Sequence, residues 1–329
     1  MVKRIFTVLC VLIVACIEFV NAQDPQFTQY YANLLYLNPA FAGSVNCPRI
    51  SVNYRNQWPA LGSTYVTYNA SYDQNVKFLE GGLGLLILQD IQGDGAIKTF
   101  NVNAMYSYSF LVKRNFAIRG GFQASYMQKT LNWNFIFPDQ IHPLYGPIYQ
   151  TNENLIPTDF HKKYFDFSAG FVGYSRHYFF GVACHHLTQP SESFRGSSDT
   201  YLPRKYTVHA GWNIPLKIRG KGLKKGDWEA SPNILFQQQE KFQQLNYGLY
   251  LSRKSIVAGV WVRHNFGFQY DSFIMLIGFI QQRIKVAYSY DLTVSKLSNQ
   301  TLGAHEVSFS YTIPCKTKKK FRAISCPSF

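Results

Sequence analysis

The sequence predicts an all-β fold: a transmembrane outer-membrane β-barrel of about fourteen antiparallel strands. Three observations predict it. Aromatic residues make up 17% of the 329-residue chain and charged residues only 16%, against about 25% charged residues in ordinary soluble domains. Apolar and polar residues alternate with a period of two along nearly the whole chain. The alternating segments are roughly ten residues long, the length that a tilted membrane strand needs.

The first 22 residues read as a secretory signal peptide. Lys3 and Arg4 precede an apolar run, residues 5–17, and small residues then lead to a cleavage site after Ala22. An exported protein of this kind can oxidise its cysteines.

Two other interpretations of this leader stay open. Glu18 ends the apolar run short of the roughly 18 to 20 residues of a spanning helix, which argues against an N-terminal anchor. Cys16 stands at the end of a lipobox-like sequence and could be acylated, although Ile17 directly after it makes this less favourable.

Segments with two-residue alternation follow one another through the mature chain. In residues 284–290, for example, Ile284, Val286, Tyr288 and Tyr290 share one face. Because a sheet in lipid cannot leave an edge unpaired, such strands must close into a barrel, which we expect to span residues 50–313. The predicted strands are 50–58, 63–74, 80–90, 97–111, 115–128, 164–176, 178–187, 205–217, 229–240, 242–252, 255–264, 269–280, 282–292 and 305–313.

The lengths of the connections predict an orientation. The long connections, 129–163, 188–204 and 293–304, are all odd-numbered, whereas most even-numbered connections are tight turns. Outer-membrane barrels have long outer loops and short periplasmic turns, so we expect both termini in the periplasm. The basic connection 218–228 is the exception.

Residues 23–49 precede the first strand and predict a docking or plug segment. Asp24-Pro25 and Asn38-Pro39 form turns, because proline fixes its own φ and biases the residue before it towards extended backbone. Gly43 gives a flexible end. The segment could act as a plug or partner-binding lid, or could simply pack against the barrel for stability.

Two regions are candidates for partner binding. The long loop 129–163 is rich in aromatic residues and stiffened by prolines, so it could grip a surface protein or only cap the mouth. The tail 314–329 could dock periplasmic machinery or stay solvated, and Cys315 and Cys326 are spaced for a disulfide loop within it. The pairing of Cys47 and Cys184 stays open. The candidate residues are Trp133, Phe135, Tyr145, Tyr149, Lys318, Lys319, Lys320 and Arg322.

The sequence predicts no catalytic residue, cofactor or metal site. His185 and His186 are adjacent at the end of a predicted strand, so we expect their rings to point to opposite faces, which disfavours a metal pair. The glycines of 81–84 predict close packing of strands rather than phosphate binding, since no helix pattern follows. The net charge of +15 is not concentrated in a way that predicts nucleic-acid binding. Charged residues expected on inward faces suit a wet lumen: Arg55, Lys98, Arg119, Asp166, Arg263, Arg283, Lys285 and Asp291.

Several motifs together resemble one family. The opening motif contains Asp24, Pro25, Gln26, Phe27, Asn38, Pro39 and Gly43, and the matches continue in order at 55–59, 145–149, 166–170, 186–190, 288–297 and 303–308. They resemble the PorP/SprF family of the Bacteroidota type IX secretion and gliding machinery, although Ala304 stands where the family more often has Ser. The resemblance implies a barrel similar in architecture to the long-chain fatty-acid porins, with no catalytic residues to transfer.

The resemblance also implies partners: an exported adhesin or other type IX substrate, periplasmic secretion components, and the lipid of the outer membrane. The sequence then leaves two functions to separate. The first is a non-enzymatic component of type IX secretion or gliding that binds and helps export or anchor a large surface adhesin. The second is a diffusion channel for hydrophobic solutes. An outer-membrane enzyme would need a cluster of acid, base or nucleophile that the sequence does not present.

Overall fold

The computed structural model describes residues 24–61, 64–113, 116–132, 136, 138–149, 160–175, 177–194, 200–216, 228–266, 269–294 and 301–315. The predicted signal peptide and most of the basic tail lie outside these residues. Among the described residues, no helix is both long enough and apolar enough to cross a membrane.

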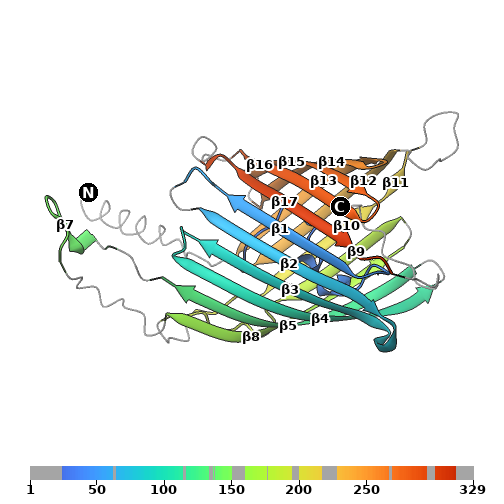
Figure 1. Cartoon of the computed structure of the whole chain (residues 1–329), viewed down its shortest axis with the longest axis horizontal. Helices are drawn as coiled ribbons and strands as arrows, with labels where there is room; N and C mark the ends of the chain where they lie inside the picture. The colour runs from blue at the N-terminus through green and yellow to red at the C-terminus, as the bar shows by residue number, and fades with distance from the viewer. Residues whose placement is uncertain are drawn as a thin grey trace, which may run out of the picture.

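All the described strands except β6 (Ile141–His142) and β7 (Gly146–Pro147) form one closed antiparallel barrel (Figure 1). The main sheet has 15 strands, of which β11 (Ile214–Pro215) is only two residues long. The other strands form the wall of the barrel. These strands are β1 (Arg49–Gln57), β2 (Tyr65–Val76), β3 (Gly81–Gln92), β4 (Ile97–Lys113), β5 (Phe116–Leu131), β8 (His161–Tyr174), β9 (Tyr178–His185), β10 (Lys205–Trp212), β12 (Trp228–Gln239), β13 (Phe242–Arg253), β14 (Ile256–Asn265), β15 (Gln269–Gln281), β16 (Ile284–Thr293) and β17 (Ala304–Thr312). The wall is closed because β1 pairs with β17 and β10 pairs with β12.

The predicted fold class and strands are confirmed. Each predicted strand overlaps one strand of the wall, and the boundaries differ by a few residues at most, except where β10 ends at Trp212 instead of at residue 217. Alternation carries large apolar side chains outwards: Ile277 is 61% exposed and Phe171 62% exposed. Their neighbours in the chain point inwards and are buried, as a barrel in lipid requires.

The two mouths of the barrel differ. The connections β5–β8, β9–β10 and β16–β17 meet at one end, the long-loop mouth, which lies at the left of Figure 1. The tight turns β4–β5, β13–β14 and β15–β16 meet at the other end, the short-turn mouth. The link from β10 to β12 is the long exception at the short-turn mouth. The long connection β5–β8 contains η3 (Pro138–Gln140) and a small hairpin of β6 (Ile141–His142) and β7 (Gly146–Pro147), which stands apart from the wall in Figure 1.

The cysteine prediction was wrong. Cys315 forms a disulfide with Cys47 and not with Cys326, which lies outside the described residues. The reason is the register of the closing strands: Arg49 faces Thr312, and the backbone N–H of Ile313 donates to Pro48 O at 2.8 Å, so the residues just beyond this pair meet. Cys184 is a free thiol.

Two charged residues expected in the lumen are exposed instead. Lys98 has the same parity as the outward Phe100 on β4, and Arg283 lies in the turn between β15 and β16. Arg55, Arg119, Asp166, Arg263 and Asp291 do point inwards and are buried. Protein rather than bulk water surrounds these five side chains, because the N-terminal segment occupies the lumen.

Candidate functional site: the lumen and its N-terminal segment

Residues 24–44, here called the lumenal segment, run through the inside of the barrel from the long-loop mouth to the short-turn mouth. Asp24 and Cys315, the two ends of the part of the chain that the structure describes, thus lie at opposite mouths, whereas the sequence predicted both termini on the periplasmic side. The segment contains α2 (Leu34–Leu37) and η1 (Pro39–Phe41), whose turns appear in blue behind β2 and β3 in Figure 1. Asn38 caps η1 by accepting a hydrogen bond from the Ala40 N–H at 2.9 Å, and Pro39 occupies the first helical position, which favours its fixed φ. Ala40, Phe41 and Ala42 are completely buried.

The base of the segment, residues 38–43, fits against inward glycines of the wall. A Cβ at Gly121 would lie 2.3 Å from the backbone N of Ala40, and one at Gly82 would lie 2.1 Å from the carbonyl oxygen of Ala42. Neither contact leaves room for any side chain. The predicted close packing of strands applies to Gly81, which lies against Ser107 and Tyr106, whereas Gly82 and Gly84 lie against the lumenal segment instead.

Polar contacts fix the same base. The side-chain amide of Asn38 donates to the carbonyl oxygens of Phe171 and Val182 at 3.2 and 3.1 Å. Gly43, at φ +59°, donates its N–H to Asp73 Oδ2 at 3.0 Å, and Asp73 also pairs with Arg49 at 2.8 Å. The segment therefore enters the first strand through a turn that only a residue tolerant of left-handed backbone adopts easily.

The middle of the segment is held by one buried carboxylate. Glu306, on β17, accepts from the backbone N–H and the hydroxyl of Thr28, both at 2.7 Å, and from the N–H of Gln29 at 3.3 Å. Arg55 lies behind it, with its Nη1 3.3 Å from Glu306 Oε2 and its Nη2 2.9 Å from Asp291 Oδ2. Buried charges of this kind are stable only when paired, so the segment supplies part of the pairing that these wall residues need.

Aromatic rings fill the lumen beside these charges. Tyr31 meets Phe179 edge to face at 5.5 Å between ring centroids, and Tyr30 lies 5.3 Å from Trp261. Trp261 is 1% exposed and packs against Tyr250 at 5.5 Å. The apolar centre of the molecule is thus made jointly by the segment and by inward side chains of the wall.

Charged side chains hold the outer end of the segment at the long-loop mouth, an arrangement called here the Asp24 clamp. Asp24 Oδ2 lies 2.9 Å from His186 Nε2 and 3.3 Å from Lys205 Nζ, and His186 Nδ1 lies 2.7 Å from Asp166. Burial disfavours the charged form of His186, but the two carboxylates outweigh that effect and raise its pKa to about 9. Burial also acts to raise the pKa of Asp24, and the charges of His186 and Lys205 outweigh it and hold that pKa well below its ordinary value.

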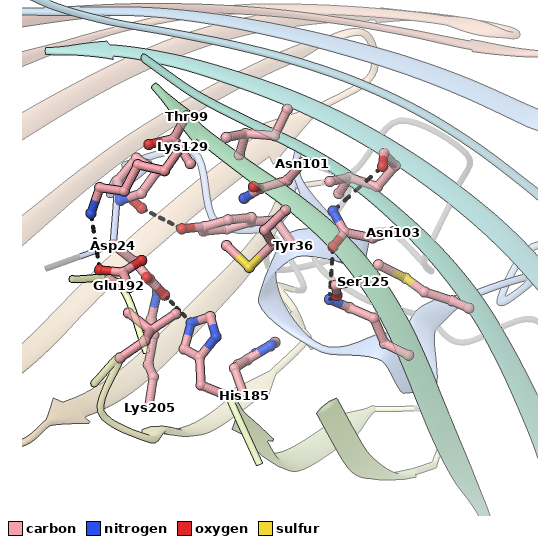
Figure 2. A pocket seen from close by; sticks show the side chains of 18 of the residues that line it. Asp24, Tyr36, Thr99, Asn101, Asn103, Ser125, Lys129, His185, Glu192 and Lys205 are labelled. Carbon is pink, nitrogen blue, oxygen red and sulfur yellow. Dashed lines mark hydrogen bonds and ion pairs between the residues drawn. The ribbon is translucent and has the colours of Figure 1, made fainter. Parts of the chain in front are cut away.

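A cavity of about 70 Å³ lies beside this clamp. Figure 2 shows the charged Asp24, Glu192 and Lys205 at one end of it and the uncharged Asn103 and Ser125 at the other. Tyr36 lies between the two groups; its hydroxyl donates to the carbonyl oxygen of Pro25, and Lys205 Nζ lies 5.0 Å from its ring centroid.

The structure describes only some of the predicted partner-binding residues. Tyr145 and Tyr149 are 73% and 53% exposed on the β6–β7 hairpin, where both rings lie near the ring of His142. Trp133 and Phe135, and the basic residues Lys318, Lys319, Lys320 and Arg322, lie outside the described residues. The N-terminal motif residues all lie in the lumen but at its two ends: Asp24, Pro25, Gln26 and Phe27 towards the long-loop mouth, and Asn38, Pro39 and Gly43 at the base.

Sequence reasoning missed the residues that receive this motif. His186, Lys205, Lys129 and Glu192 belong to strand ends or to the loop after β9, and no spacing in the sequence connects them. Lys129 Nζ lies 2.9 Å from Glu192 and closes one side of the cavity. One signal in the sequence could have indicated that such residues exist. Residues 24–29 are rich in hydrogen-bond donors and acceptors, and these groups need partners when they are buried in a lumen.

Comparison with protein families gives one match. The model described as "Type IX secretion system membrane protein PorP/SprF" covers residues 19–311. The chain belongs to the PorP/SprF family. With the closed wall and its apolar outer face, membership in this family makes the protein an outer-membrane β-barrel of the type IX secretion system. A search of the curated proteins gives no match.

Solved structures similar to this chain include other barrels. The toluene transporter TbuX of Ralstonia pickettii shares 7% identity over 85% of this chain and 93% of its own, at a TM-score of 0.49. A mutant of the monoaromatic hydrocarbon channel TodX shares 10% identity over 85% and 94%, at 0.48. BamA of Haemophilus ducreyi shares 10% over 82% and 71%, at 0.40. At these values the likeness says nothing about what this PorP/SprF protein binds or transports.

Proposed function

We propose that this PorP/SprF protein is a non-enzymatic component of type IX secretion that binds an exported surface adhesin at the long-loop mouth and periplasmic machinery at the short-turn mouth. The observation that carries the proposal is the lumenal segment, which crosses the barrel from one mouth to the other and seals Glu306 and Arg55 from water. A filled barrel suits a scaffold for partners better than a conduit for solutes. The membrane protein would then act by binding rather than by conduction.

The hairpin of β6 and β7 is the proposed contact for the exported protein. The Nδ1 of His142 accepts hydrogen bonds from the N–H groups of Leu144 and Tyr145 at 3.1 and 3.3 Å, which gives the tip a defined shape. Leu144 is 82% exposed and Ile148 56% exposed, beside the two tyrosines. Exposed apolar and tyrosine side chains on an ordered turn are typical of protein-binding surfaces. Trp133 and Phe135 are proposed to extend this contact.

The basic tail is the proposed contact for periplasmic machinery. Its described start, Cys315, is fixed to Cys47 at the short-turn mouth. Lys318, Lys319, Lys320 and Arg322 follow in the sequence within a few residues of that anchor. A cluster of positive charges attached there suits an acidic partner surface.

The competing function is diffusion of hydrophobic solutes through the barrel. It requires a continuous apolar route, whereas the described lumen contains buried Arg55, Arg263, Asp291 and Glu306 as well as the segment itself. Transport of this kind would therefore need the lumenal segment to leave.

Deletion of the gene, followed by assays of surface adhesin and of hydrophobic solute uptake in the same cells, tests the proposal. We expect loss of surface adhesin with unchanged uptake, and restoration of display by the intact gene. A variant with Leu144, Tyr145 and Tyr149 changed to Ser should insert normally and display poorly. A matched control changes three lipid-facing residues of the wall to other apolar residues. Normal display together with lost uptake would instead establish the channel.

A further inference from the structure

The cavity beside the Asp24 clamp has a lining that points to one chemical class of ligand. We propose that it is a subsite for the primary amide of an asparagine or glutamine side chain from the exported protein, a proposal that rests on the function proposed above. The cavity opens among residues at the long-loop mouth, including Gln92, Thr99 and Lys129. An exported chain at that mouth can therefore reach it.

Charge argues for an uncharged ligand. Lys129 is paired with Glu192 at 2.9 Å, and Lys205 and His186 are both paired with Asp24. A carboxylate or an ammonium in the cavity would have to separate one of these pairs or stay unpaired inside the protein, and both are costly.

The uncharged lining offers both a donor and an acceptor. Among the described residues, the Asn101 side chain has no hydrogen-bond partner, and its Oδ1 is buried. Gln123 donates from Nε2 to Asn103 and Ser125, at 3.2 and 2.9 Å, while its Oε1 accepts from no residue in the described ranges. Thr99 adds a hydroxyl that can do either. A carboxylate would satisfy only the donors and an ammonium only the acceptors, whereas an amide satisfies both.

Size and apolar contacts favour a primary amide. A cavity of roughly 150 Å³ holds the six carbons of benzene, so about 70 Å³ suits a group of three or four non-hydrogen atoms. Leu86, Leu88, Met105 and Met127 line the same space and provide contact for the methylene carbon that carries the amide. The N-acetyl group of a sugar, and the peptide group itself, are secondary amides and larger.

The test uses the full mature protein in detergent and three small probes: acetamide, acetate and N-methylacetamide. Ligand-observed saturation-transfer NMR measures their binding, which for so few atoms falls in the roughly millimolar range. We expect saturable binding of acetamide and much weaker binding of the other two. Equal binding of acetate would contradict the proposal that the ligand is uncharged. Equal binding of N-methylacetamide would indicate a secondary amide instead of a side-chain primary amide.

Variants connect the binding to the cavity. Asn101→Leu keeps the approximate shape of the side chain and should weaken acetamide binding about tenfold, which corresponds to the loss of one hydrogen-bonding group. Thr99→Val is the second, milder variant, in case the first one fails to fold. Asn56→Leu is the control, because Asn56 is also a half-buried amide on a strand but lies outside the cavity. Unchanged acetamide binding in both folded test variants would contradict the assignment.

The same variants separate this proposal from the proposed function. Probe binding does not require secretion, so the NMR result stands even if gene deletion leaves surface adhesin unchanged, in which case only the proposed function fails. If deletion abolishes display, Asn101→Leu should reduce it while Asn56→Leu does not. Normal display by Asn101→Leu cells would show that the amide does not come from the exported protein.

Discussion

The two ends of the lumenal segment are held by different physical means. At the short-turn end, Ala40 and Ala42 lie directly on Gly121 and Gly82, and shape decides the fit. At the long-loop end, Asp24 is held by His186 and Lys205, and the attraction of opposite charges holds the segment there. Steric fit is insensitive to pH and salt, whereas ion pairs respond to both. We therefore expect the base to stay in place across solution conditions and the outer end to respond to pH.

The largest effect is expected between these two ends. Glu306→Ala removes the carboxylate that holds Thr28 and leaves Asp291 as the one carboxylate paired with Arg55 among the described residues. Breaking a buried pair typically costs about 3 to 5 kcal/mol, so thermal unfolding in detergent should occur at a clearly lower temperature. Glu240→Ala, in the turn between β12 and β13, is the control. Equal stability of the two variants would mean that the pairing is not what seats the middle of the segment.

The second-largest effect is expected at the base of the lumenal segment, residues 38–43. In Gly121→Ala the new Cβ meets the backbone of Ala40, which cannot rotate away, so the segment should lose its seat at a cost of about 3 kcal/mol. Protease cleavage within residues 24–44 should rise and should not depend on salt. Gly120→Ala is a close control, because its Cβ meets only the ring of Phe171 at 3.2 Å. Similar cleavage of both variants would argue against the steric seat.

The outer end should respond to alkaline pH. In the folded protein the pKa of His186 is raised to about 9. The stabilisation that protonated His186 gives to the folded state is therefore complete below about pH 6.5 and is lost as the pH rises through about 9. Between pH 7 and pH 9 the loss is about 2 kcal/mol. Protease cleavage near residues 24–29 should increase over this range, with cleavage near residues 38–43 unchanged. In His186→Asn the increase should disappear, and its persistence would assign the response to another group.

The smallest effect is expected from Asp24→Asn. The amide still accepts a hydrogen bond from Lys205 but carries no charge, so at neutral pH the outer end should be weakened by about 1 kcal/mol. Added salt should weaken the wild-type clamp only slightly, because its side chains are at most 15% exposed, and should leave the variant almost unchanged. The depressed pKa of Asp24 means that the wild-type clamp persists to acidic pH and is lost only as the pH falls below the ordinary range of an aspartate.

The fold was readable from the sequence because each strand carries its own signal. Ile284, Val286 and Tyr288 face lipid by parity alone, and the lengths of the connections separated the two mouths. The N-terminal docking segment was predicted from its two proline turns. Its receiving residues were not, because Glu306, Gly121 and His186 become neighbours only when the barrel has closed. The prediction of the disulfide was wrong for the same reason, because Cys47 and Cys315 are 268 residues apart in sequence.

The bond between Cys47 and Cys315 has a topological consequence. It makes residues 47–315 a covalent macrocycle, and residues 24–46 thread back through the hole of that same macrocycle, so the chain has the form of a lasso. A force applied to the threaded end would be carried by a covalent ring rather than by the hydrogen bonds of the seam between β1 and β17. The seam between β1 and β17 is therefore expected to stay closed when the threaded end is pulled.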